Sequence, residues 1–98
     1  MDLDFSSSSL RRAFESKEEA IRCFGEARGK KYVMNLLLVK RSKTMADLYR
    51  IPQLRFHPLK GDRKGEFSVA LTGNWRIVLS FATDKHASIE RVEDYHGR

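Results

Sequence analysis

Apolar and polar side chains alternate along three segments in the C-terminal half of the chain, residues 66–71, 75–81 and 87–93. A period of two is typical of a strand that buries one face. Polar turn residues at 72–74 and 83–85 separate the segments. The pattern therefore predicts three strands joined by short turns.

The length of the turn at residues 72–74 decides which face the first two strands share. Their apolar rows are Phe67, Val69 and Leu71 on the first strand and Trp75, Ile77, Leu79 and Phe81 on the second. A two-residue loop would put these rows on opposite faces, whereas a three-residue loop with Asn74 in a left-handed conformation puts them together. We favour the three-residue loop, which sends Arg76 to the face away from the core.

The N-terminal part of the chain is predicted to be mainly helical. Residues 2–5 alternate like a short strand, and the serines at 6–9 offer N-cap hydroxyls for a brief helix at 10–14. A Ser-x-x-Glu pattern at 16–19 fits the start of a second helix that runs to about residue 41. Its apolar stripe is Ala20, Phe24, Ala27, Met34 and Leu38. Gly25 and Gly29 weaken this helix, so a break near residues 29–30 stays open.

Residues 43–65 link the helices to the sheet. A further helical turn is predicted over 43–50 and ends at Pro52, after which residues 54–57 alternate like a strand. Leu54 and Phe56 should face inward, so Arg55 and His57 lie on the opposite face, where a polar site could be built. A glycine-bracketed basic loop follows at 60–65.

These elements predict an α+β fold in which N-terminal helices pack on one face of a small, twisted, mainly antiparallel β-sheet. A chain of 98 residues has room for one hydrophobic core, so we expect a single domain over residues 1–98. The longest apolar run, residues 36–39, is far shorter than a membrane span, and residues 1–4 do not resemble a signal peptide. We expect a cytoplasmic protein without membrane contact.

The net charge of +6 is unevenly distributed. Residues 28–64 hold eleven Lys and Arg against two Asp, a local charge of +9, and the rest of the chain carries −3. Such a basic stretch often neutralises phosphates, although a solvated surface or an acidic protein partner would also suit it. The single cysteine, Cys23, can form no internal disulfide and lacks neighbours for a metal site, so we expect neither a metal nor a cofactor.

Several polar side chains could gather on the free face of the predicted sheet. They are His57, Lys60, Arg63, Lys64, Arg76, Tyr95 and His96. Metal-free RNA cleavage needs a base for the 2′-hydroxyl, cations for the phosphorane, and an acid for the 5′-oxygen, and these residue types can supply all three. Any basic domain with three histidines fits this description, so the inventory alone does not assign a function.

Three motifs in this half of the chain resemble a known family. They are Ile-Pro-Gln-Leu-Arg-Phe-His-Pro-Leu-Lys-Gly-Asp-Arg-Lys-Gly at 51–65, Gly-Asn-Trp-Arg-Ile at 73–77 and Glu-Asp-Tyr-His at 93–96. In order and spacing they resemble the plasmid-maintenance killer proteins, the HigB-like branch of the RelE toxin superfamily. The resemblance covers about residues 44–96, and the N-terminal helices match only in general character. It implies a RelE-like fold.

The resemblance also implies a function. Such a protein is the toxin of a type II toxin-antitoxin system, a ribosome-dependent mRNA endonuclease that cuts translated mRNA in the ribosomal A site by metal-free attack of the 2′-hydroxyl. Its implied partners are the ribosome, mRNA and a HigA-like helix-turn-helix antitoxin, with operator DNA reached only through the antitoxin. The alternative is a catalytically inactive module of the same fold that binds RNA or the antitoxin-operator complex.

Site residues carry over from the motifs one by one. The implied catalytic residues are His57, Lys60, Arg76, Asp94, Tyr95 and His96. Lys60 and Arg76 would stabilise charge at the scissile phosphate, and the assignment of base and acid among residues 94–96 stays open. The candidate contacts to RNA or the ribosome are Arg55, Arg63, Lys64, Lys40 and Arg41.

Structural alternatives stand beside these roles. His57 could be an ordinary strand-surface histidine, and the C-terminal run could be a frayed end. Arg76 could form a simple cross-strand ion pair with Glu66 or Glu90. We predict that Trp75 belongs to the core, because it continues the apolar row of its strand.

Overall fold

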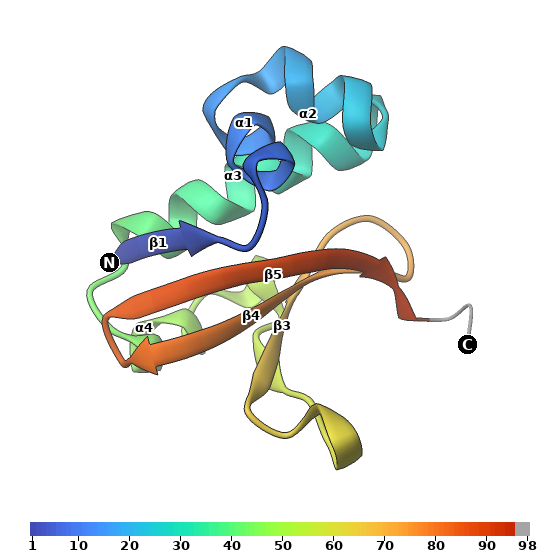
Figure 1. The fold of residues 1–98 in the computed structure, drawn as a ribbon. Coiled ribbons are helices and arrows are strands. Elements are labelled where there is room, and N and C mark those ends of the chain that lie inside the picture. The colour runs from blue at the N-terminus through green and yellow to red at the C-terminus, as the bar shows by residue number, and fades with distance from the viewer. Residues whose placement is uncertain (96–98) are drawn as a thin grey trace.

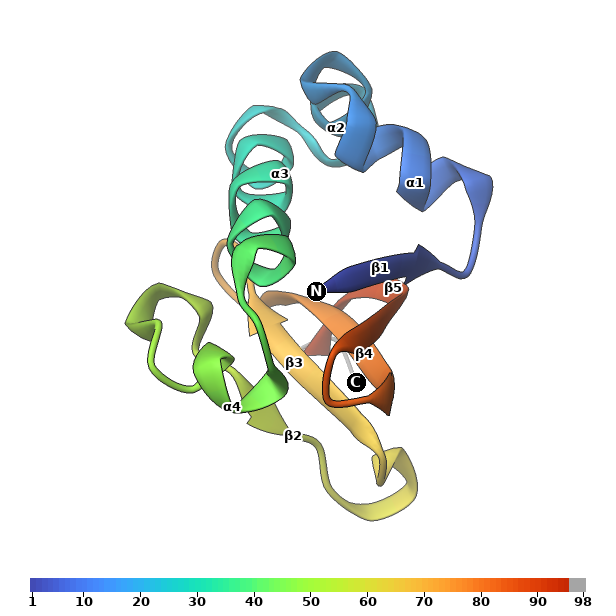
Figure 2. The same cartoon turned by 90° about the vertical axis from the view of Figure 1, so that its left-hand side faces the viewer.

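The computed structural model describes residues 1–95 and shows a five-stranded mixed sheet with helices packed on one face (Figures 1 and 2). The elements are β1 (Asp2–Phe5), α1 (Ser8–Glu15), α2 (Lys17–Phe24), α3 (Glu26–Arg41), α4 (Met45–Leu48), the 3-10 helix η1 (Pro52–Leu54), β2 (His57–Pro58), the 3-10 helix η2 (Gly61–Arg63), β3 (Glu66–Ala70), β4 (Trp75–Thr83) and β5 (His86–Asp94). The strand order is β1-β5-β4-β3-β2, with β1 parallel to β5 and the other neighbours antiparallel. The predicted α+β class is confirmed.

The helical layer contains a break that the sequence placed four residues too late. Gly25, with a φ of 91°, separates α2 from α3, whereas Gly29 lies buried inside α3. A Cβ atom on Gly29 would stand 2.6 Å from the backbone of Ala20, so α2 and α3 cross in direct backbone contact here. Gly29 is therefore required for close packing of two helices, and Gly25 provides the left-handed turn between them.

This break also changes which side chains α3 buries. Tyr32, Leu36 and Val39 are fully buried, while Ala27 is exposed and Met34 is 51% exposed. The predicted stripe is wrong for Ala27 and Met34. Its spacing was extended across Gly25, where the chain changes direction and the helical phase is not kept.

The hairpin between β3 and β4 has the predicted geometry. Val69 lies opposite Ile77, and the Leu71 N–H donates to the Trp75 carbonyl at 3.0 Å, which closes a three-residue loop over 72–74. Both apolar rows consequently face the helices and form the core. The left-handed residue in the loop is Gly73, with a φ of 58°, and not Asn74 as predicted, because glycine adopts this conformation without a steric cost.

The segment before β3 differs from the predicted strand at 54–57. Pro52 begins a 3-10 turn, and Arg55 adopts a left-handed conformation with a φ of 48°. Only His57 and Pro58 pair with β3, so the strand is two residues long. The predicted burial is nevertheless correct, since Leu54 is fully buried and the Phe56 ring stacks on another core ring.

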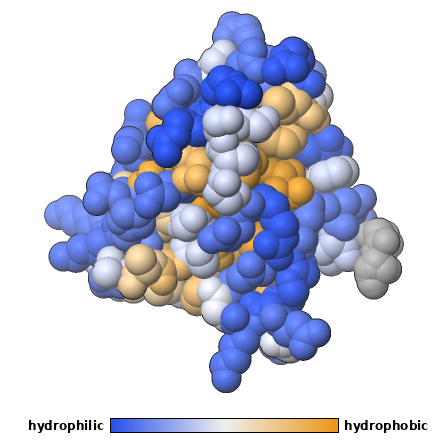
Figure 3. Space-filling view, in the orientation of Figure 1, coloured by the Kyte–Doolittle hydropathy of each residue, from blue (hydrophilic) through white to orange (hydrophobic). Residues whose placement is uncertain are grey.

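The face of the molecule shown in Figure 3 is largely hydrophilic, most clearly at the projecting loop that contains η2 (Figures 1 and 3). Apolar atoms show between the helices and the sheet, where α1, α2 and β5 border a hollow of about 370 Å³ (Figure 3). None of the helices described has the length and apolar character needed to cross a membrane.

Candidate active site on the open face of the sheet

The sheet face that points away from the helices carries the polar side chains, and we call it the open face. Strand register assigns its residues, because directly opposed residues share a face. Ala70 lies opposite Arg76, and Arg76 lies opposite Glu93. Arg76 is therefore on the open face, as predicted from the hairpin loop.

A cleft of about 540 Å³ opens at one end of this face. Its walls bring together Arg55 and His57 from the segment around β2, Arg76 from β4, and Tyr95 from the residue after β5. The turn between β3 and β4 forms a further wall. The structure thus brings four of the predicted site residues to one place from three separate segments.

His57 is exposed at the rim of the cleft and lies opposite Ser68 in the β2–β3 pair. Its Nδ1 atom is 2.9 Å from the Arg55 carbonyl. When Nδ1 carries a proton it donates to this carbonyl, which leaves Nε2 as the atom for proton transfer. The left-handed turn at Arg55 therefore orients the imidazole.

Arg76 is the most buried cation of the site, with its side chain 13% exposed. Its Nε donates to Glu93 Oε2 at 2.9 Å, and its Nη2 lies 2.7 Å from the same oxygen in an ion pair. Its guanidinium carbon lies 4.7 Å from the centre of the Tyr95 ring. Glu93 is its partner here, so the predicted alternatives Glu66 and Glu90 are both wrong. Tyr95 is 51% exposed and stacks beside the cation.

The C-terminal run of residues 94–96 contributes to the cleft only in part. Asp94 is exposed and lies opposite Trp75 in register, which places it on the sheet face that carries the apolar row. Of the two residues of this run that the structure describes, Tyr95 lines the cleft. His96 lies outside the described residues.

The remaining basic candidates fall into three places. Lys60 and Lys64 are exposed in the loop around η2, whereas Arg63 of the same loop turns inward to Glu66 and Glu93. Lys40 and Arg41 are exposed at the end of α3 and belong to a different part of the surface. Trp75 packs against the core as predicted, and it is also one of the residues that line the cleft.

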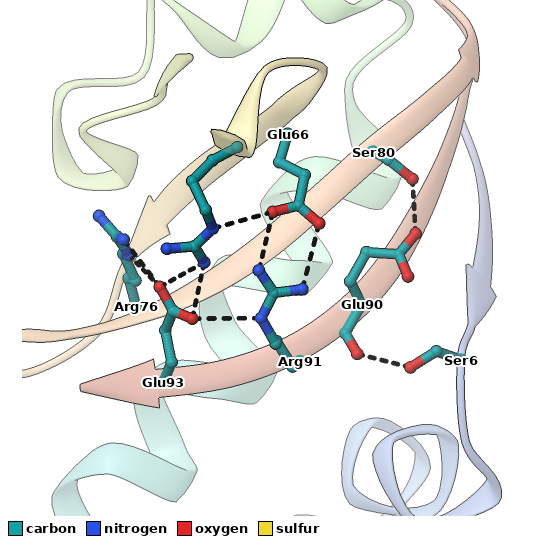
Figure 4. A network of polar contacts seen from close by, with 8 residues as sticks. Ser6, Glu66, Arg76, Ser80, Glu90, Arg91 and Glu93 are labelled. Carbon is teal, nitrogen blue, oxygen red and sulfur yellow. Dashed lines mark hydrogen bonds and ion pairs between the residues drawn. The ribbon is translucent and has the colours of Figure 1, made fainter. Parts of the chain in front are cut away.

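An ionic network covers the open face beside the cleft (Figure 4). It was not predicted from the sequence. Glu93 accepts hydrogen bonds from Arg63, Arg76 and Arg91, and Glu66 accepts from Arg63 and Arg91. Partial burial raises the pKa of Glu93, but the three arginines outweigh it and lower the pKa to about 2. Hydrogen bonds from Arg91 lower the pKa of Glu66 as well.

One sequence signal could have found Glu93. Ile89 and Val92 both belong to the core side, yet they are three positions apart, so one residue must be extra. The structure places this irregularity opposite Val78 and Leu79. The bulge inverts the alternation of β5 and turns Glu93 to the open face.

The arrangement can bind a phosphate and move a proton. Arg76 and Arg55 supply positive charge, and His57 and Tyr95 are titratable groups at the same cleft. Among residues 1–95, no group of three or more His, Cys, Asp or Glu side chains is placed to hold a metal ion.

Comparison with known proteins gives one sequence relative. No family model matches the chain. The chain is 48% identical over 42 residues to the endoribonuclease HigB of Proteus vulgaris, a match that covers 43% of this chain and 45% of HigB. The matched part thus spans less than half the length of this curated relative.

The fold has solved counterparts. YafQ from Escherichia coli superposes with a TM-score of 0.61 at 19% identity, covering 98% of this chain and 94% of YafQ. A chain of the YoeB–YefM complex from Staphylococcus aureus superposes with a TM-score of 0.63 at 16% identity, covering 95% of this chain and 94% of that one. At these identities the likeness establishes the fold. The predicted α+β fold is thus shared with these structures, and the resemblance to HigB is confirmed over the 42 matched residues.

Proposed function

We propose that this protein is the toxin of a type II toxin-antitoxin system and an endoribonuclease that cuts translated mRNA in the ribosomal A site. The observation that carries the proposal is the cleft that joins His57, Arg76 and Tyr95. The similarity to HigB, an endoribonuclease, supports the same activity. An inactive module that only binds RNA or the antitoxin-operator complex is the alternative.

The proposed reaction needs no metal. The 2′-oxygen attacks the adjacent phosphorus, the bond to the 5′-oxygen breaks, and the products are a 2′,3′-cyclic phosphate and a 5′-hydroxyl. Arg76 and Lys60 would stabilise the added negative charge on the phosphorane. The proton of the 2′-hydroxyl would pass to one of His57, Tyr95 and His96, and a second of these groups would protonate the leaving oxygen.

The comparisons support an antitoxin as one of the proposed partners. YoeB was solved in a complex with YefM, and YafQ was solved with DinJ as a toxin-antitoxin complex. By analogy we expect a HigA-like helix-turn-helix antitoxin that inhibits this toxin and carries it to operator DNA. The ribosome and mRNA would be the other partners, in the cytoplasm, and the exposed side chains of Lys40, Arg41 and Lys64 are available for RNA contact.

Induction in bacterial cells tests the activity. We expect the wild-type protein to arrest growth and to create new 5′ ends in a translated message, detected by primer extension. The same message without its start codon should stay intact, because cleavage needs the ribosome. Arg76→Ala should lower cleavage by roughly 10²-fold, the cost typical of losing one group that stabilises the transition-state charge. His57→Ala and Lys60→Ala should also reduce it.

Arg12→Ala is the matched control, since Arg12 is an exposed arginine on α1. It should leave growth arrest unchanged. Normal growth of cells that contain the wild-type protein, with no new 5′ ends, would favour the inactive binding module. Cleavage of the message without a start codon would contradict ribosome dependence.

A further inference from the structure

Glu93 occupies the centre of the charges on the open face. It lies opposite Arg76 in the β4–β5 pair, one residue before the C-terminal run. Its side chain is 22% exposed and is surrounded by three guanidinium groups (Figure 4).

The contacts of Glu93 fix the orientation of Arg76. Nε of Arg76 donates to the carboxylate oxygen Oε2, and Nη2 forms an ion pair with the same oxygen, so two nitrogens along one edge of the guanidinium contact Glu93. These two contacts do not use Nη1, and the same side chain borders the cleft. Arg76 therefore contacts the Glu93 carboxylate and also borders the cleft.

A second contact ties the basic loop to the same carboxylate. The Nη2 atom of Arg63 lies 2.8 Å from both oxygens of Glu93, and its Nε donates to Glu66 at 3.3 Å. Arg63 is the last residue of η2, in the loop that carries Lys60 and Lys64. One anion thus holds both the cation of the cleft and the loop beside it.

The anion also reduces repulsion among the cations. Arg63, Arg76 and Arg91 all approach Glu93, and without its charge these like charges would favour separation. An arginine on a long flexible side chain would then sample many orientations. A preorganised cation stabilises a developing charge better than a mobile one.

We infer that Glu93 is a positioning residue, whose carboxylate holds Arg76 toward the cleft and anchors the loop of Lys60 through Arg63. The inference rests on the proposed function. A simple loss of structure would lower both the cleavage rate and the affinity for RNA, whereas loss of a positioning residue would lower only the cleavage rate. Removing the negative charge should impair cleavage, yet it should not weaken the attraction for RNA, because the face becomes more positive.

The test compares the purified wild-type protein with Glu93→Gln and Glu90→Gln. Glu90 is a matched control, because it lies on the same strand, carries the same charge, and its carboxylate accepts a hydrogen bond from Ser80. Three quantities are measured: hydrogen exchange of the Arg76 Nε–H by NMR, affinity for a single-stranded oligonucleotide with 2′-deoxyriboses, and cleavage of a message in a translating extract.

For Glu93→Gln we expect Arg76 Nε–H exchange at least tenfold faster and cleavage at least tenfold slower than in the wild type. Oligonucleotide affinity should be unchanged or up to threefold tighter. Glu90→Gln should stay within twofold of the wild type in all three. Unchanged exchange in Glu93→Gln, unchanged cleavage, or a parallel loss of affinity and cleavage would each overturn the inference.

Two further outcomes are covered: a Glu93→Gln variant that does not fold, and a wild-type protein that does not cleave. If Glu93→Gln fails to fold, Glu93→Asp retains the charge with a carboxylate one methylene shorter. Protection of the Arg76 Nε–H and cleavage should then be retained together or lost together, and fast exchange with full cleavage in that variant overturns the inference. If the wild-type protein itself cleaves no message, the proposed function fails. The positioning of Arg76 is then decided by exchange and affinity alone.

Discussion

The two faces of the sheet are built from the same strands but differ in character: one is apolar and buried, and the other is charged. On the helix-covered face, Ile77 and Leu79 are fully buried together with Leu36 of α3. On the open face, the neighbouring positions of the same strands carry Arg76 and Glu93 in a charged network. Strand alternation therefore separates the residues that stabilise the fold from those that are free to act on a ligand.

The difference has an energetic reason. Full burial of an aliphatic side chain contributes about 1.5–3 kcal/mol, and its loss also leaves a cavity. Partly exposed ion pairs contribute much less, because water already solvates the separated charges. The helix-covered face should consequently control stability, and the open face should control activity.

The largest expected effect is Leu36→Ala, on the helix-covered face. Leu36 is fully buried in the core cluster, so its truncation should lower the free energy of unfolding by about 2–5 kcal/mol. Arg76→Gln, on the open face, should cost less than about 1.5 kcal/mol, because Glu93 keeps Arg63 and Arg91 as partners. Urea denaturation measures both, and equal costs would contradict the division between faces.

A smaller effect is expected from acid. The pKa of Glu93 is lowered from 4.5 to about 2, so this carboxylate takes up its proton at a lower pH in the folded state than in the unfolded state. The stabilisation from its ionised form is complete above about pH 5 and is lost as the pH falls toward 2, by about 2 kcal/mol. Urea denaturation at pH 7, 5 and 3 should show this loss.

The Glu93→Gln variant tests whether Glu93 causes this loss of stability in acid. This variant should lose less stability between pH 5 and pH 3 than the wild type, whereas Glu90→Gln should lose as much as the wild type. Glu66 retains its own acid dependence in both variants, because Arg91 lowers its pKa independently of Glu93. Identical acid profiles for all three proteins would show that the network does not stabilise the fold.

The parts of the fold that the sequence predicted correctly are those determined by local alternation. The β3–β4 hairpin was predicted because two apolar rows can share a face only across an odd loop, and that rule placed Arg76 correctly. The segment at 52–58 was harder to predict. The left-handed conformation of Arg55 is uncommon for a residue with a side chain, and no local pattern indicated it.

The parts that were missed depend on contacts between distant residues. Gly25 and Gly29 carry the same helix penalty, and only the packing of α2 on α3 shows which one ends a helix. The partner of Arg76 depended on a bulge in β5 that changes the strand's register. Motifs therefore predicted four residues of the cleft, whereas Glu93, which contacts one of them, was missed because its only signal was the broken alternation between Ile89 and Val92.

The smallest expected effect concerns the exposed loop beside the cleft. Lys64→Gln should change the free energy of unfolding by less than about 0.5 kcal/mol, because this side chain is exposed. If Lys64 neutralises an RNA phosphate, its loss should reduce the slope of log affinity against log salt concentration by about 1. Lys17→Gln removes the same charge from α2, at the far end of the molecule from this loop (Figures 1 and 2), and should leave the slope unchanged. Equal slopes for the two variants would mean that net charge, and not the open face, determines RNA affinity.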